Sequence, residues 1–211
     1  VYTDDVPASA IDKYLAVQGE RFRNPILRIF HTELEAVYEE KNRGLDSDGR
    51  RVFEKLFAEL FKNHNYGLQT TIGTIEHLKN PSLVEIRNYF NKYYVPNNMG
   101  VIMSGDFDPD VMIKKVDATF AYMKNKPVAK YTFKPEQPIT APMASEIVGP
   151  DAENVTIGFR LPGNKSKDVL LADLVGQILT NGKAGLMDLN LKKKKKLLGA
   201  STSVFTLIDY G

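Results

Sequence analysis

The chain has 211 residues, of which 43% are hydrophobic and 26% are charged, an ordinary composition for a globular protein. A formal net charge of +2 gives no general reason to expect a nucleic-acid partner, and the absence of cysteine excludes disulfides and thiolate metal sites. No apolar run reaches the roughly 18 residues that suggest a membrane span, so we expect none. The length allows one large or two small domains, and nothing in the composition indicates a compartment.

Hydrophobic spacing predicts a series of helices, over residues 8–22, 25–43, 50–63, 82–93, 108–123, 168–179 and 185–198. Two of them begin with clear capping signals. Ser82 and Glu85 have the spacing of a capping box, and Asp108 is followed by Pro109, which suits the first position of a helix. The intervening stretch 64–81 is rich in turn-forming residues, and we expect it to be irregular.

Four shorter segments have the composition of β-strands, namely Met99–Ser104, Ser145–Val148, Asn154–Leu161 and Ala200–Asp209. The strands and helices do not alternate strictly, which favours an α+β fold class over a doubly wound parallel sheet. Residues 124–142 contain four prolines and are the best candidate for a linker between domains.

Two glutamates seven residues apart, Glu33 and Glu40, are the most informative pair in the chain. Seven residues are almost two helical turns, so both carboxylates fall on one face, within about 20° of each other and about 10.5 Å apart along the axis. This spacing suits one direct metal ligand and one carboxylate that supports a ligand imidazole. A solvated helix face carrying Glu33, Glu35, Glu39 and Glu40 is the commoner explanation of such spacing.

The sequence around this pair, Glu33-x-x-Ala-Val-x-x-Glu40, resembles the zinc peptidases of the pitrilysin/insulinase family, which includes the mitochondrial processing peptidases. That family carries a helix ending in Tyr-Tyr-x-Pro-x-Asn-Met, followed by an apolar segment ending in Gly-Asp. Matching residues occur here at Tyr93, Tyr94, Pro96, Asn98, Met99, Gly105 and Asp106. The resemblance is strong from about Asp5 to Tyr122 and weaker beyond.

The resemblance implies a zinc metalloendopeptidase that hydrolyses peptides. In the family, two histidines of a His-x-x-Glu-His motif and a glutamate further along the chain hold zinc. By the match, Glu40 stands at the third ligand and Glu33 at the catalytic-site carboxylate that orients a ligand histidine. The motif itself is absent, since the histidines are His31, His64 and His77. We therefore expect zinc in the complete protein, weak zinc binding or none by this chain alone, and no peptide hydrolysis by it.

The resemblance also implies an arrangement of domains. Residues 1–123 would form the rear part of one pitrilysin-like α/β-roll domain, 124–135 a linker, and 136–211 the beginning of a second, similar domain. The expected partners are a peptide or unfolded protein substrate and the remainder of the same protein. A sheet that lacks strands would expose an edge, so self-association is a further expectation.

Two other interpretations of the whole chain remain open. A non-catalytic homologue would keep the fold and act as one half of a peptide-binding clamp or as an assembly partner. An unrelated α+β binding domain would use the lysine run Lys192–Lys196 as its contact. A helix spreads five consecutive residues over all its faces, so the lysines are better explained as a solvated helix than as a nucleic-acid or acidic-lipid patch.

The remaining candidate sites have simpler explanations. His31 and Glu35 lie one turn apart and could hold a metal, but a contact on the helix surface explains them better. His64 and His77 are expected at the surface or in polar packing. The segment Asp46–Gly49 is expected to be a turn, because its glycine does not have the spacing of a calcium loop.

Overall fold

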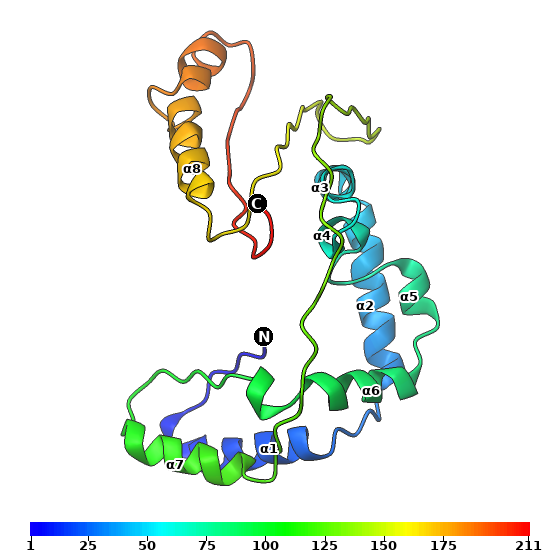
Figure 1. Cartoon of the computed structure of the whole chain (residues 1–211), viewed down its shortest axis with the longest axis vertical. Coiled ribbons are helices and arrows are strands. Elements are labelled where there is room, and N and C mark those ends of the chain that lie inside the picture. Colours follow the sequence, from blue (N-terminus) through cyan, green and yellow to red (C-terminus); the bar gives the residue numbers. More distant parts are fainter.

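The computed structural model describes residues 1–211 and consists of helices joined by extended chain (Figure 1). In chain order the elements are a 3-10 helix (Ala8–Ala10), α1 (Ile11–Arg23), α2 (Phe30–Leu45), α3 (Asp48–Leu60), α4 (Asn65–Leu68), α5 (Ile75–Lys79), α6 (Leu83–Tyr93), a 3-10 helix (Pro96–Asn98), α7 (Pro109–Phe120), α8 (Lys167–Leu179) and a π-helical turn (Asp188–Lys192). Helix α1 packs against α7, α2 against α5 and α3, and α3 against α4.

Most of the helices lie where the sequence predicts them. The caps of two are confirmed: the Ser82 hydroxyl accepts a hydrogen bond from the Glu85 amide at 3.3 Å, and the Asp108 carboxylate accepts one from the Asp110 amide at 2.8 Å. Helix α2 begins at Phe30 instead of residue 25, after a turn that follows Pro25. The helix expected over 185–198 is the largest error, because helical structure there ends at Lys192.

The predicted α+β fold class, with its α/β-roll domains, is wrong for this chain, because the structure contains no β-strand. The one β-type pairing is an isolated antiparallel bridge between Pro162 and Tyr210. The segments expected as strands are extended, but a strand needs a neighbour for its N–H and C=O groups. Such neighbours occur only locally, where the Leu161 and Gly211 backbones exchange hydrogen bonds of 2.6 and 2.9 Å. The sheet edge expected to drive self-association is therefore also absent.

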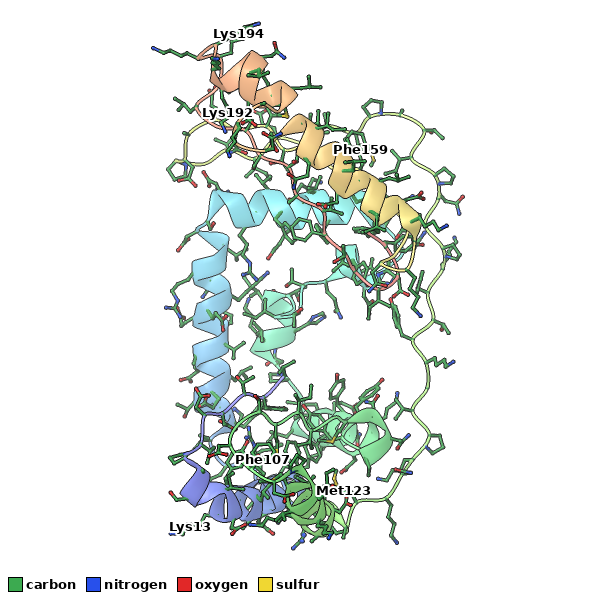
Figure 2. The ribbon with its side chains drawn as sticks, turned by 90° about the vertical axis from the view of Figure 1, so that its left-hand side faces the viewer. Lys13, Phe107, Met123, Phe159, Lys192 and Lys194 are labelled. Atoms are coloured by element: carbon green, nitrogen blue, oxygen red, sulfur yellow. The ribbon has the colours of Figure 1, made fainter.

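The molecule is open, with little interior. Its accessible surface is 16484 Å², whereas a compact chain of 23.7 kDa exposes about 10,000 Å². Figure 1 shows why: α1, α6 and α7 gather at one end, α2 leads away to α3 and α4, and α8 lies apart in the C-terminal part. The extended chain after α7 runs from the end that holds α1, α6 and α7 to the region of α3 and α4. Figure 2 shows this extended chain on the opposite side of the molecule from α2. Only 12 of 211 residues are buried, so packing is confined to small clusters.

An aromatic cluster joins α1, α6 and α7 at the first end. The ring of Phe22 lies 6.0 Å from Tyr94, 6.5 Å from Phe90 and 6.3 Å from Phe120, measured between centroids. The hydroxyl of Tyr2 is 2.6 Å from that of Tyr94, and this hydrogen bond, with partial burial, raises the pKa of Tyr94 to about 12. Aromatic pairs of this kind contribute beyond their buried area, so the cluster fixes how the three helices pack.

His64 lies in a second cluster, where the C-terminal part of the chain meets α3 and α4. Its residue is only 1% exposed, so it is a packing histidine and not a surface one. Its Nδ1 accepts a hydrogen bond from the Tyr66 amide at 3.1 Å, which leaves Nε2 to donate to the Asp209 carboxylate at 3.3 Å. The rings of Tyr66, Tyr131, Phe133 and Tyr210 surround it. Both ring nitrogens of His64 are thus engaged in hydrogen bonds within the chain.

Candidate metal-binding face of helix α2

Helix α2 carries both glutamates that the sequence singles out. Glu33 lies in its first turn and Glu40 near its end, and both residues are exposed. Neither carboxylate has a hydrogen-bond or ion-pair partner in the chain. Both positions are helical, so the expected geometry holds, with the two carboxylates on one side of α2 and about 10.5 Å apart along its axis. Their assignment to a zinc site stays a prediction.

A buried ion pair fixes α2 next to Glu40. The Lys41 ammonium donates to both oxygens of Glu54 in α3, at 3.1 and 3.3 Å, and its side chain is only 7% exposed. Arg50 adds a second contact to the same carboxylate at 3.3 Å. This pair was not predicted from the sequence, although one signal for it is present. Lys41 continues the apolar spacing of Leu34 and Tyr38, and such a position points a lysine into packing.

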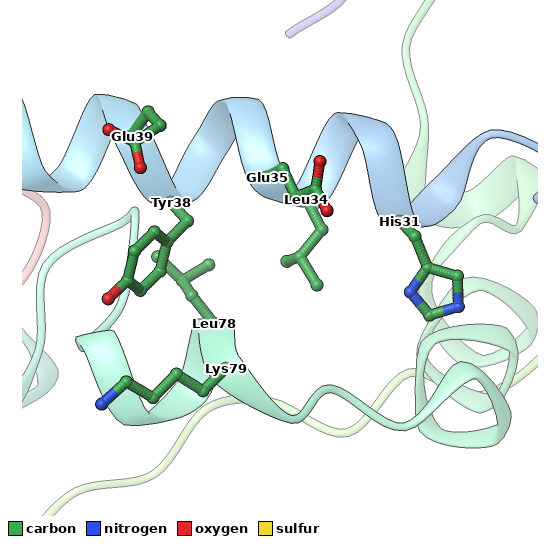
Figure 3. Close-up of a pocket in the computed structure, with 7 residues that line it drawn as sticks. All are labelled: His31, Leu34, Glu35, Tyr38, Glu39, Leu78 and Lys79. Atoms are coloured by element: carbon green, nitrogen blue, oxygen red, sulfur yellow. The ribbon is translucent and has the colours of Figure 1, made fainter.

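A shallow pocket of about 280 Å³ lies between α2 and α5 (Figure 3). In Figure 3, His31, Leu34 and Tyr38 project from α2 toward α5, and Leu78 faces them. At about 100° per residue, these three α2 positions lie roughly 100–160° around the helix from Glu33. The pocket and the two glutamates therefore occupy different faces of α2, and the pocket is not part of the predicted metal site.

The histidines of the chain do not approach the glutamate pair. His31 lines the pocket, His64 is buried at the far end of α3, and His77 caps α5 by accepting from the Thr74 amide at 3.5 Å. No group of three or more potential ligands among histidine, aspartate and glutamate comes together in the structure. Catalytic zinc takes three protein ligands. Glu40 is one carboxylate without neighbouring ligands in residues 1–211, so these residues do not form a complete zinc site.

Two other carboxylates in the structure are fully occupied by structural roles. Asp48 accepts a hydrogen bond from the Asp151 amide at 2.9 Å and pairs with Arg51, and together these hold the pKa of Asp48 below its usual value. The Asp188 carboxylate pairs with Lys192 at 2.8 Å and accepts from the Asn181 and Gly182 amides, which lowers its pKa in the same way. In the segment Asp46–Gly49, Asp46 lies in the turn that ends α2, as expected, and α3 begins at Asp48.

Curated relatives of this chain are named as zinc proteases. It is 26% identical over 179 residues to the "Zinc protease PqqE" of Helicobacter pylori, covering 82% of this chain and 40% of that protein. It is 30% identical over 98 residues to the "Probable zinc protease PqqL" of Haemophilus influenzae, covering 46% of this chain and 10% of that protein. The chain thus spans less than half the length of either relative.

A solved structure shares the arrangement of the helices. The crystal structure of a protease from Helicobacter pylori superposes with a TM-score of 0.69 at 19% identity, covering 98% of this chain and 52% of that one. At this identity the likeness concerns the fold alone. None of the helices here has the length and apolar character that crossing a membrane requires.

The family described as "Peptidase M16 inactive domain" matches residues 82–211. Glu33 and Glu40 lie before this range, and α6, α7 and α8 lie within it. The resemblance to pitrilysin-like peptidases that the motifs indicated is thereby confirmed. Because the match covers more than half of the chain, the chain belongs to the peptidase M16 family.

Proposed function

We propose that this chain is a fragment of a zinc-dependent metalloendopeptidase and supplies it with one zinc ligand, Glu40, and one supporting carboxylate, Glu33. The observation that carries the proposal is the pair itself: two exposed carboxylates on one face of α2, free of any partner, in a chain of the M16 family. Exposed glutamates without partners are available to a ligand from outside these residues. The names of the two relatives support zinc as that ligand.

Glu40 would hold the metal directly, and Glu33 would accept a hydrogen bond from the imidazole of a ligand histidine. A carboxylate in that second role fixes the orientation of the ring and raises its basicity. The Lys41–Glu54 ion pair and the contact with α5 keep α2 in place while it does so. When bound, zinc supplies a water of lowered pKa as nucleophile. The histidines would come from a segment outside residues 1–211, so we expect this chain alone to bind zinc weakly and to leave peptides intact.

The experiment compares the isolated chain with a protein that contains both this chain and a His-x-x-Glu-His segment. Zinc content and peptide hydrolysis are measured for each. In the longer protein, Glu40→Gln should abolish both, and Glu33→Gln should lower zinc affinity or activity by about 10–100-fold. Glu39→Gln is the matched control, because Glu39 is adjacent in sequence but lines the α2–α5 pocket. Stoichiometric zinc with steady turnover in the isolated chain would overturn the proposal, as would full activity of the Glu40→Gln variant.

A second proposal is a non-catalytic role as a peptide-binding or assembly surface. Residues 82–211 match a family described as inactive, which favours this role for that part of the chain. Val155, Ile157 and Phe159 alternate along an extended segment and are 87%, 75% and 77% exposed, as a surface that receives an apolar peptide would be. The test is binding of an unfolded protein to the isolated chain. Binding without cleavage supports the role, and absence of binding removes it.

Self-association is also a proposal, and it rests on a different surface from the one first expected. Without a sheet there is no sheet edge, but α8 exposes a row of apolar side chains. Leu170, Leu174 and Ile178 are 73%, 57% and 53% exposed and lie on one face of the helix. Sedimentation at increasing protein concentration tests this, and a strictly monomeric species at high concentration would contradict it.

A further inference from the structure

The lysine run Lys192–Lys196 lies in a tight turn at one end of the molecule, where Figure 2 labels Lys192 and Lys194. Helical structure ends at Lys192, and Lys195 has a left-handed backbone with a φ of 55°. The Lys195 amide bonds to the Lys192 carbonyl and the Lys196 amide to the Leu191 carbonyl, both at 2.9 Å. These two bonds close a Schellman-type cap. The expectation that a helix spreads the lysines over all its faces therefore fails.

Most of the charge in this turn is not neutralised. Lys192 pairs with Asp188 at 2.8 Å, and Lys194 donates to the amide oxygen of Asn190 at 3.2 Å. No carboxylate pairs with any of the four residues Lys193–Lys196, and all four are exposed. The turn thus concentrates four positive charges within four residues, in a chain whose formal net charge is only +2.

Two solvent-exposed leucines follow the lysines directly in the sequence. Leu197 is 47% exposed, and Leu198 is fully exposed, at 103%. A basic cluster beside exposed aliphatic side chains suits the surface of an anionic bilayer, where cations meet the head groups and apolar groups enter the interface. Nucleic-acid sites use aromatic rings or arginines against the bases, and the segment Leu186–Ser201 contains neither.

We propose that the turn Lys193–Leu198 binds the surface of a bilayer that contains anionic lipids. The lysines contact head-group phosphates and carboxylates, and Leu197 and Leu198 enter the interfacial layer. A lysine near such a surface contributes about fivefold to the partition coefficient, and four together contribute several-hundred-fold. The attraction falls off within a Debye length, roughly 8–10 Å at ordinary ionic strength, so binding depends strongly on salt.

The test uses the complete chain of 211 residues and co-sedimentation with vesicles. Vesicles of phosphatidylcholine alone are compared with vesicles that also contain phosphatidylserine, in low salt and in about 0.5 M salt. The variant Lys193→Gln, Lys194→Gln, Lys195→Gln, Lys196→Gln should lose at least a hundredfold in binding to the anionic vesicles. The double variant Leu197→Ser, Leu198→Ser should lose several-fold while keeping the salt dependence.

The matched control removes four lysines from the extended chain, as Lys124→Gln, Lys126→Gln, Lys130→Gln, Lys134→Gln, with the same change in net charge. It should bind like the unmodified chain, and circular dichroism verifies that each variant keeps its helices. Equal binding to both kinds of vesicle, absence of binding, or an equal loss in the control would each overturn the proposal. Tighter binding to a single-stranded oligonucleotide than to anionic vesicles would overturn it in favour of nucleic acid.

Discussion

Two regions of the chain differ in how they satisfy their backbone hydrogen bonds. Residues 8–123 are mostly helical, whereas residues 124–160 contain no helix and no strand. Of 95 backbone hydrogen bonds, 66 lie inside regular elements, and these elements are all helices. A helix pairs its own N–H and C=O groups, whereas an extended segment depends on a neighbour. The extended part is therefore held by side chains and not by pairing between strands.

Two groups of side chains hold the extended part against α3. In the first, which we call the Arg160 clamp, Arg160 donates to the Leu60 and Gln137 carbonyls and lies 3.8 Å from the Glu136 carboxylate. Glu136 in turn accepts from the His64 amide at 2.8 Å. In the second, the Asp48 clamp, Asp48 accepts from the Asp151 amide, and Arg51 donates to the Val148 carbonyl at 3.1 Å.

Removing the Arg160 clamp should have the largest effect. Arg160→Ala leaves the carboxylate of Glu136, whose side chain is only 2% exposed, without its cation. An unpaired buried charge costs about 3 kcal/mol of unfolding free energy. Urea denaturation measures that loss, and hydrogen exchange should show faster exchange for the amides of residues 131–137 and 209–211 than for those of α1 and α7. Arg28→Ala, at an exposed arginine without a partner, is the control and should change stability by less than about 0.5 kcal/mol.

A uniform increase in exchange over the whole chain would contradict the expected difference between the extended part and the helices. It would mean that the extended part and the helices of residues 8–123 unfold together, as one cooperative unit. An unchanged denaturation midpoint would instead mean that the clamp contributes nothing to stability.

Breaking the Lys41–Glu54 pair tests the helical part in the same way. Lys41→Ala leaves Glu54 next to Arg50, and the Glu54 side chain is 24% exposed, so the remaining carboxylate is partly compensated. We expect a loss of about 2 kcal/mol, smaller than for Arg160. Lys41→Met keeps the aliphatic packing and should recover part of that loss. If both variants unfold at the same urea concentration as the unmodified chain, the pair does not hold α2 to α3.

The sequence predicted most of the longer helices because their signals are local, but the short helices α4 and α5 lie in the stretch 64–81 that was expected to be irregular. Ser82 and Asp108 cap the helices that they were expected to cap, since a cap needs only residues within one turn. The strands failed for the opposite reason. Asn154–Leu161 has the composition of a strand, but its periodicity does not indicate where a partner lies. In the structure only its last residue, Leu161, pairs with another backbone segment, at Gly211.

Prediction of the candidate site was also limited by distance along the chain. The spacing of Glu33 and Glu40 is local, so their common face could be read from the sequence. The burial of His64 depends on Asp209, which lies 145 positions away, and the Lys41–Glu54 pair depends on how α2 meets α3. The spacing within α2 indicates that Lys41 is buried, but no pattern within one element identifies Glu54 or Asp209 as the partner. The lysine run shows the same limit, because the chain turns where a regular helix was expected.

Glycine at position 195 should stabilise the chain slightly. Lys195 has a φ of 55°, which strains a residue that carries a Cβ. Lys195→Gly should therefore raise the free energy of unfolding by about 1 kcal/mol, measured by urea denaturation. Lys193→Gly is the matched control, since Lys193 has a φ of −62° and glycine there should destabilise the chain slightly. A loss of stability with Lys195→Gly would mean that the turn does not adopt this backbone in solution.

Acid should loosen the Asp48 clamp. The Asp151 amide and Arg51 hold the pKa of Asp48 below its usual value of about 4. A lowered pKa gives stability that is present above the unfolded value and is lost as pH falls through the folded one. As the pH falls below about 4, hydrogen exchange at residues 148–151 should therefore accelerate in the unmodified chain.

Asp48→Asn sharpens this last prediction, because the amide oxygen can still accept from Asp151 but carries no charge for Arg51. The variant should be less stable at neutral pH and should lose the acceleration in acid that comes from Asp48. The Nε atom of Arg51 is buried without a hydrogen-bond partner, so this clamp already leaves one polar group unsatisfied and should be the weaker of the two. If acid leaves exchange at residues 148–151 unchanged in the unmodified chain, the charge on Asp48 does not hold the extended chain against α3.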